Sequence, residues 1–418
     1  MTRKRFQVNG FVVALLLILI AIGYYVDTVV VPTIPPPFVP TATPTRSPES
    51  FVTEAQAMFA QGKLLQAIEL YTEAIRSNPK DDSVYVYLAQ TQVFAGQYTD
   101  AQSNAENALL LNPNNAMAHA VLAWSLDFQG KYVEAMDAIT RSLELDPNNG
   151  IAHACNAEIL ADAATAGVGG LDNLTRAADE SRVALSLSPN TIEANRARGY
   201  ILEVTGNYEE AIQFYQAAIA INGNIPDLHM ALGRNYRFLG VYDKAIEEFT
   251  RANSLNPPDP MPDLMISRTY STIGEYAKAA QFAESSVNDA PTDPTLRGNY
   301  GVMLYHKMDW VEAATQLGMA VNGGQAADGQ VVSPIPFATE GRVVEYYFTY
   351  ALALARLNRC GEALPIAQML LGRVPSNEIA VANSNETIRM CESNLSVTPS
   401  PTLSIPTVTV TPAPTSTP

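Results

Sequence analysis

The sequence predicts an all-α protein in which one helix–turn–helix unit is repeated to form a solenoid. A proline ends a short turn at intervals of 34, 34, 42, 68 and 34 residues. An alanine stands twelve residues before each of these prolines, and a glycine stands five residues before most of the alanines. A fixed period of this length indicates stacked supersecondary units. The prolines are Pro79, Pro113, Pro147, Pro189, Pro257 and Pro291.

Each unit carries the signals for two helices. The first half has apolar residues at helical spacing, as in Tyr85, Leu88 and Ala89. The glycine ends this helix, because it adopts a positive φ without steric cost. The second half begins near the alanine, whose small side chain lets two helices approach closely, and the Asn-Pro turn stops it.

This pattern resembles the tetratricopeptide repeat. One unit shows it in full, with Gly233-x-x-Tyr236, Gly240-Val-Tyr242-Asp-Lys-Ala245-Ile246, Phe249, Ala252 and Asn256-Pro257. The resemblance implies a right-handed α-solenoid of nine units over residues 48–377, with an extra loop near 163–173, an insertion at 328–343 and a capping helix at 378–395. The units are residues 48–81, 82–115, 116–149, 150–191, 192–225, 226–259, 260–293, 294–327 and 344–377.

The start of the chain is typical of a membrane anchor. Arg3, Lys4 and Arg5 precede an uncharged stretch of 21 residues, Phe6 to Val26, which is long enough to span a bilayer as a helix. We expect residues 1–31 to form a signal-anchor helix with a cytoplasmic N-terminus and the repeats outside. The alternative is a cleaved signal peptide and a secreted protein.

Two segments rich in proline and threonine flank the repeats. Residues 32–47 form a linker, and residues 396–418 form a tail. Such composition favours extended, disordered segments without a packed core. The tail either is O-glycosylated, as in Ser/Thr/Pro stalks, or is unmodified.

Composition and motifs argue against several functions. The chain of 418 residues has 26 Lys and Arg against 42 Asp and Glu, for a net charge of −16, which does not favour nucleic-acid binding. Its four histidines form no HExxH motif, and Gly170 is not followed by the Lys-Ser/Thr of a P-loop. We therefore expect no enzyme, no cofactor and no metal site.

The resemblance also implies a binding surface. In the family, the first helix of each unit lines a concave groove that holds an extended peptide or a partner helix. The matching positions give an apolar part followed by an arginine-rich part. They are Val86, Phe94, Met117, Trp124, Phe128 and Ile151 in units two to four, and Arg196, Tyr200, Met230, Arg234, Arg237, Leu264 and Arg268 in units five to seven.

Three of these groups leave alternatives open. We expect Trp124 to be exposed in the groove, whereas Phe94 and Phe128 either line it or pack onto the next unit. Arg234 and Arg268 are 34 residues apart and should lie one above the other. They either bind an acidic partner through bidentate contacts or are neutralised by carboxylates such as Glu203 and Asp227.

These expectations lead to two functional hypotheses. The first is a membrane-anchored, extracytoplasmic scaffold that binds a protein or peptide partner in its groove, an acidic one if the arginines are free to bind it. The second is a receptor or assembly subunit that presents substrates to a cell-envelope enzyme such as a transferase.

The cysteines suggest one covalent link. Cys360 lies between the two helices of unit nine, and Cys391 lies near the end of the capping helix. Packing of that helix beside unit nine would bring the two within disulfide reach, in the oxidising compartment that export implies. The alternative is two separate thiols that fill space. Cys155 is expected to stay unpaired and buried.

Overall fold

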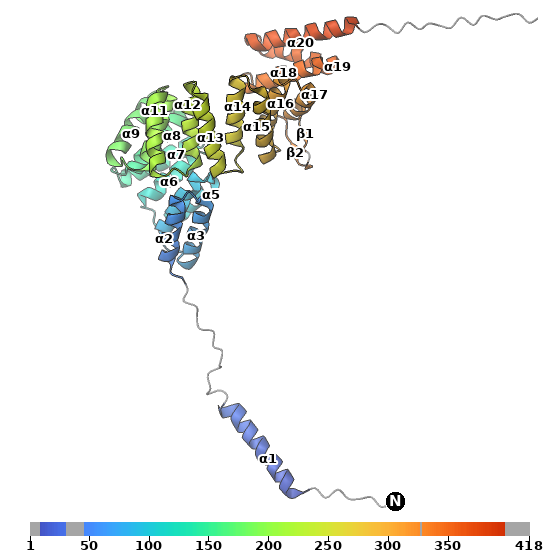
Figure 1. Cartoon of the computed structure of the whole chain (residues 1–418). Helices are drawn as coiled ribbons and strands as arrows, with labels where there is room; N and C mark the ends of the chain where they lie inside the picture. Colours follow the sequence, from blue (N-terminus) through green and yellow to red (C-terminus); the bar gives the residue numbers. More distant parts are fainter. Residues whose placement is uncertain (1–8, 31–45, 327, 398–418) are drawn as a thin grey trace, which may run out of the picture.

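The computed structural model describes residues 9–30, 46–326 and 328–397, and in these residues nine consecutive helix pairs stack side by side (Figure 1). This arrangement confirms the expected all-α solenoid. A last helix, α20 (Glu378–Val397), packs on the ninth pair. The pairs are α2 (Pro48–Ala60) with α3 (Leu64–Ser77), α4 (Asp82–Phe94) with α5 (Tyr98–Leu111), α6 (Ala116–Asp127) with α7 (Tyr132–Leu145), α8 (Gly150–Thr165) with α9 (Asn173–Leu187), α10 (Ile192–Val204) with α11 (Tyr208–Ile221), α12 (Pro226–Phe238) with α13 (Tyr242–Leu255), α14 (Pro260–Thr272) with α15 (Tyr276–Asp289), α16 (Pro294–His306) with α17 (Trp310–Asn322) and α18 (Arg342–Arg356) with α19 (Cys360–Arg373).

The repeated residues act as the sequence predicts. Gly96 ends α4 with φ of 74°, a conformation that costs glycine little. Ala101 and Ala135, at the start of second helices, are fully buried. In units eight and nine the same turn position is held by Met308 and Asn358, which also have positive φ. Asparagine tolerates this region, whereas methionine does so at a cost.

Aromatic stacking joins one unit to the next. The ring of Tyr98, at the start of α5, stacks on Phe128 with a centroid distance of 4.6 Å, and Tyr208 stacks on Phe238 at 4.8 Å. Where a second helix begins with Tyr98, Tyr208 or Tyr276, the ring stacks on an aromatic ring of the next unit.

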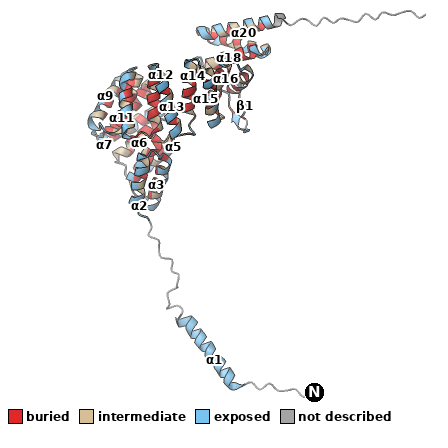
Figure 2. Ribbon diagram, in the orientation of Figure 1, coloured by how far each residue is buried: buried red, intermediate tan, exposed pale blue. Residues whose placement is uncertain are grey.

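The N-terminal helix packs against nothing in the solenoid. It comprises α1 (Gly10–Tyr25), continued by the π-helix η1 (Val26–Val30). The span Gly10–Val29 has a mean hydropathy of 2.3 and none of it is buried (Figure 2). It is long and apolar enough to cross a membrane, although a signal sequence passes the same test. The basic residues before it, most of the linker and most of the tail lie outside the described residues.

A two-stranded β-ribbon, which the all-α prediction did not include, lies between α17 and α18. Strands β1 (Gly324–Gln325) and β2 (Val331–Val332) pair antiparallel, with Gly324 opposite Val332. After this ribbon α18 packs closely on α16, where a Cβ on Gly298 would lie 2.5 Å from the ring of Tyr346. In Figure 1, α18 and α20 run across the direction of α14 and α16. The insertion therefore changes the course of the solenoid.

Candidate partner-binding surface

The solenoid closes on itself after one turn of its superhelix. The Asn222 side chain, at the end of α11, donates a hydrogen bond of 3.0 Å to the backbone carbonyl of Phe59 in α2. Gly62 lies so close to Asn224 that a Cβ on this glycine would be 2.0 Å from the Asn224 Cβ. We call these four residues the closure contact. It lays α12 over the inner face of the earlier units.

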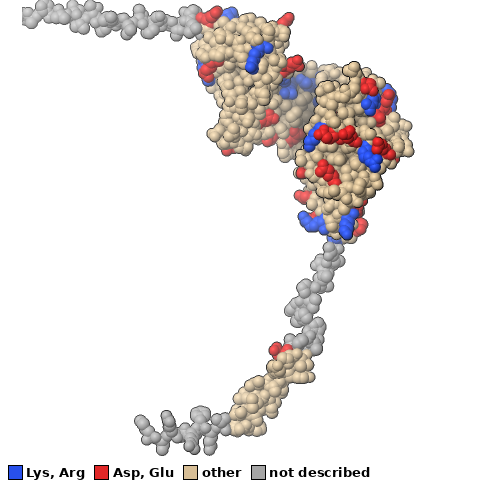
Figure 3. Space-filling view, turned by 180° about the vertical axis from the view of Figure 1, so that it is seen from behind, with Lys and Arg blue, Asp and Glu red and all other residues tan. Residues whose placement is uncertain are grey.

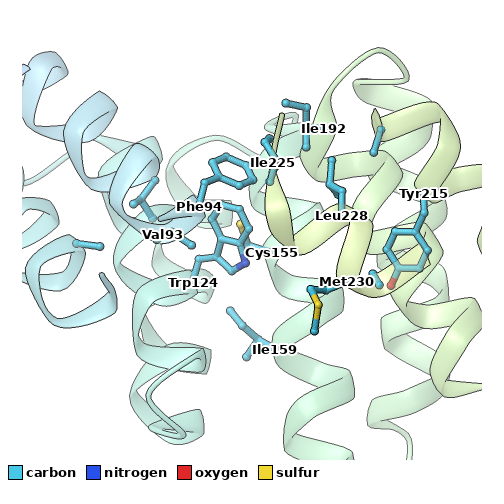
Figure 4. Close-up of a cluster of buried hydrophobic side chains, with 14 of the residues drawn as sticks. Val93, Phe94, Trp124, Cys155, Ile159, Ile192, Tyr215, Ile225, Leu228 and Met230 are labelled. Atoms are coloured by element: carbon cyan, nitrogen blue, oxygen red, sulfur yellow. The ribbon is translucent and has the colours of Figure 1, made fainter. Parts of the chain in front are cut away.

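A hydrophobic core fills the space inside this closed turn. The edge of Phe94 meets the face of Trp124, with ring centroids 5.1 Å apart. Ile225 and Leu228 belong to the same buried cluster, and Figure 4 shows them approaching the two rings from the other side. Side chains that come from units two and six thus share one core.

The expected exposure of Trp124 is therefore wrong. This side chain is only 2% exposed, and its indole N–H donates to Glu158 Oε2 at 2.9 Å. Phe94 is buried as well, so its packing alternative holds. The physical reason is the closure contact, which covers positions that face solvent in an open superhelix. Three further groove positions, Val86, Met230 and Leu264, are also buried. Met230 borders the pocket described below, and Leu264 packs with Val287 and Leu296 in its own and the next unit.

A pocket of about 260 Å³ remains between the two sides of the closed turn. Tyr98 and Phe128 line one side, and Asp227 and Met261 line the other. The volume is below the range of most small-molecule sites. It suits one large side chain rather than an extended peptide. Among the remaining groove positions, Met117, Phe128, Ile151 and Tyr200 are half-buried.

Arg196 is a structural residue. Its Nε donates to Asp227 Oδ2 at 2.9 Å, and its Nη1 forms an ion pair with Glu158. Its guanidinium also lies 5.6 Å from the ring centroid of Trp124. Burial raises the pKa of Glu158, and the charge of Arg196 opposes that rise. The arginine thus compensates a carboxylate inside the core.

Arg234 is neutralised by a carboxylate, which was one of the two alternatives given for this residue. Its Nε donates to Glu203 Oε1 at 2.8 Å. Glu203 also accepts hydrogen bonds from the Tyr215 hydroxyl at 2.9 Å and from Asn235 at 3.0 Å. This network occupies the guanidinium, so Arg234 is not free to bind an anion.

In the described residues Arg237 and Arg268, unlike Arg196 and Arg234, form no ion pair with a carboxylate. The Nε of Arg237 is buried and has no hydrogen-bond acceptor, and the Nε of Arg268 reaches only Asn299 Oδ1, at 3.5 Å. Burial and the charge of Arg342 lower the pKa of both groups. The sequence pattern does not single out Arg342, because this residue is the first of α18, next to the insertion, and lies outside the repeat pattern.

The carboxyl of Asp127 lies near Arg196 in the core. Asp127 is buried, and its carboxyl interacts with the neighbouring carboxyls of Asp162 and Glu158. Burial, and then the neighbouring carboxyls Asp162 and Glu158, raise the pKa of Asp127 to about 9. The hydroxyl of Tyr200 donates to Asp162. Sequence reasoning missed these carboxyls, although acidic residues within the alanine-rich α8 were a usable signal.

In the structure a disulfide joins Cys360 and Cys391, whose Cα atoms are 5.6 Å apart. Cys155 is a buried free thiol in α8. The link attaches α20 to the start of α19. In the described residues, no group of three or more His, Cys, Asp or Glu is arranged to hold a metal ion.

The fold defines an α-solenoid, a class in which stacked units build extended surfaces that bind other proteins. Models of the tetratricopeptide repeat match residues 58–124, 95–159, 192–225 and 226–259. The chain is a tetratricopeptide-repeat protein.

Two solved structures illustrate the similarity. A tetratricopeptide repeat protein from Parabacteroides merdae is 16% identical, with a TM-score of 0.40 over 62% of this chain and 98% of that chain. The pilF protein of Pseudomonas aeruginosa is 20% identical, with a TM-score of 0.41 over 49% of this chain and 89% of that chain. No curated protein matches the sequence. These likenesses are too distant to transfer a partner.

Proposed function

We propose that the protein is a membrane-anchored scaffold that holds a protein partner outside the cytoplasm. In this proposal the partner contacts the inner face formed by the last turn of α12 together with α14 and α16, rather than the inner face of α4, α6 and α8. The supporting observation is the closure contact, which covers the earlier inner face with α12 while the later helices lie beyond the closed turn.

The N-terminal helix supports the anchoring. Residues Gly10–Val29 form an apolar helix that nothing in the solenoid covers, and exposed apolar surface of this size is stable in a bilayer rather than in water. The basic residues ahead of it favour a cytoplasmic N-terminus. The paired cysteines in the repeat domain agree with an oxidising compartment.

Site-specific photocrosslinking in the host cell tests the binding face. Met261, in the first turn of α14, is 44% exposed and lies on the later-unit side of the pocket, with Asp227 of α12, at the edge of the proposed face. Leu110, at the end of α5, is 81% exposed and serves as the control. A photoreactive residue at 261 in the full-length, membrane-embedded protein should give a discrete crosslinked product that the same residue at 110 does not. Identical products at both positions, or none at 261, would overturn the proposed face.

A further inference from the structure

We propose that Arg237, Arg268 and Arg342 together form a binding site for the carboxylates of an acidic protein segment. This inference rests on the proposed function and names the chemistry of the partner.

Three helices from separate units bring the arginines close enough for the charge of Arg342 to act on both Arg237 and Arg268. Arg237 lies in the last turn of α12, Arg268 lies in α14, and Arg342 opens α18. The insertion places α18 against α16, with Tyr346 packed on Gly298. Figure 3 shows Lys and Arg side chains gathered in the hollow where the C-terminal helices meet the earlier part of the solenoid. The site therefore exists only because the solenoid changes course after α17.

The arginines of this group have unused hydrogen-bonding capacity. Arg237 Nε is buried without an acceptor. Arg268 has Asn299 Oδ1 at 3.5 Å from its Nε, at the limit of a hydrogen bond, and the neutral Tyr346 hydroxyl as a second neighbour. Arg342 Nε donates to Glu345 at 2.9 Å. In the described part of the chain, Glu345 is the one carboxylate in an ion pair with any of the three.

The other two inner-face arginines each have at least one carboxylate of their own, whereas the three arginines of this site share one. Arg196 has two carboxylates, Glu158 and Asp227, and Arg234 has Glu203. Three guanidinium groups that share one carboxylate repel each other, and burial increases this repulsion. A ligand with several carboxylates would relieve it and would supply the missing acceptors through charge-assisted bonds.

The net charge of the protein favours an acidic protein segment as the ligand of this site. The chain carries a net charge of −16, so an acidic segment is repelled by most of the surface and attracted at this hollow. Arginine is also suited to planar carboxylates because of its fork of donors. An acidic segment that spans the hollow would contact all three helices at once.

Fluorescence anisotropy with a labelled hexaglutamate peptide tests the site on the purified full-length protein in detergent. We expect binding that weakens with salt. The double variant Arg237→Gln, Arg342→Gln should lower the affinity by about tenfold or more, since it removes two charge-assisted contacts. The control is Arg389→Gln on α20, whose side chain is exposed and pairs with Glu386.

The outcomes separate the alternatives. An equal loss of affinity in the Arg389 variant would mean that the peptide responds only to the total charge of the protein. Full displacement of the peptide by inorganic phosphate at matched ionic strength would indicate a phosphate site. Either result would overturn the proposal. The variant Arg237→Lys, Arg342→Lys keeps both charges and should bind with intermediate affinity. Crosslinking at Met261 that persists in the glutamine variant would leave the scaffold function standing while the acidic ligand fails.

Discussion

The side chain of Asn222 donates a hydrogen bond of 3.0 Å to the carbonyl of Phe59, although 163 residues separate the two in sequence. In a simple solenoid, repeats contact only their neighbours. Here the end of the fifth helix pair touches the first, and the contact decides which inner surface faces solvent.

Closure can be tested with a matched pair of glycine variants. Gly62 and Gly96 both have positive φ, so alanine costs roughly 1 to 2 kcal/mol of backbone strain at either position. At Gly62 the new Cβ would also lie 2.6 Å from the Asn224 carbonyl oxygen, whereas at Gly96 nothing lies within 4 Å. We expect Gly62→Ala to lower the melting temperature more than Gly96→Ala and to speed hydrogen exchange in α2. Equal effects of the two variants would show that closure contributes nothing to stability.

Removal of Arg196 should destabilise the core strongly. Arg196→Met leaves Glu158 buried without its cation, which costs about 3 to 5 kcal/mol. The control Arg141→Met, in an exposed ion pair with Glu144, should stay within about 1 kcal/mol of the parent. Thermal unfolding measures both. A second change, Glu158→Gln, should restore part of the loss, and its failure to do so would argue against charge compensation.

Asp127 should make stability fall as pH rises. The carboxyl ionises at about pH 3.9 in an unfolded chain, whereas burial and the nearby carboxyls raise its folded pKa to about 9. The folded state therefore binds more protons between these values, and its contribution to stability, complete below pH 4, is lost progressively up to pH 9.

The variant Asp127→Asn removes this titration. We expect it to raise the melting temperature at pH 8 and to flatten the decline between pH 5 and pH 9, compared with Asp137→Asn, a change at an exposed carboxyl on α7. An unchanged pH profile would mean that Asp127 does not hold its proton in the folded protein.

The disulfide should be present in protein isolated without reductant. Thiol counting after denaturation is expected to find one free thiol, Cys155, and three after reduction. The sequence separation of the bridge is 31 residues, and in the chain-entropy model such a loop contributes about 3.7 kcal/mol. Three thiols before reduction would contradict the bridge.

The proposed membrane anchor predicts the topology of the protein. Protease added to spheroplasts should digest the repeat domain while a cytoplasmic marker protein stays intact. Full protection of the repeats, with digestion only after lysis, would place them in the cytoplasm and contradict the proposed location.

The solenoid could be predicted from the sequence, whereas much of the candidate site could not. Glycines such as Gly96 and alanines such as Ala101 report local requirements of one helix pair, so their spacing predicts the units directly. The exposure of Trp124 was predicted wrongly because it depends on α12, which lies several units away in the sequence. No residue near Trp124 indicates that the superhelix closes. The positions of Arg237 and Arg342 likewise depend on how the insertion turns α18.

The closure contact also determines how the repeat domain carries a mechanical load. Among the described residues, α2 is the next helix after the N-terminal helix, so a pull transmitted from the N-terminal side reaches the solenoid there. In an open solenoid such a force peels units away one at a time, because each interface is loaded in turn. Here the force acts on the interface of α3 with α4 and, in parallel, on the hydrogen bond and packing between Phe59, Gly62, Asn222 and Asn224. The first turn of the superhelix therefore resists extension as a ring.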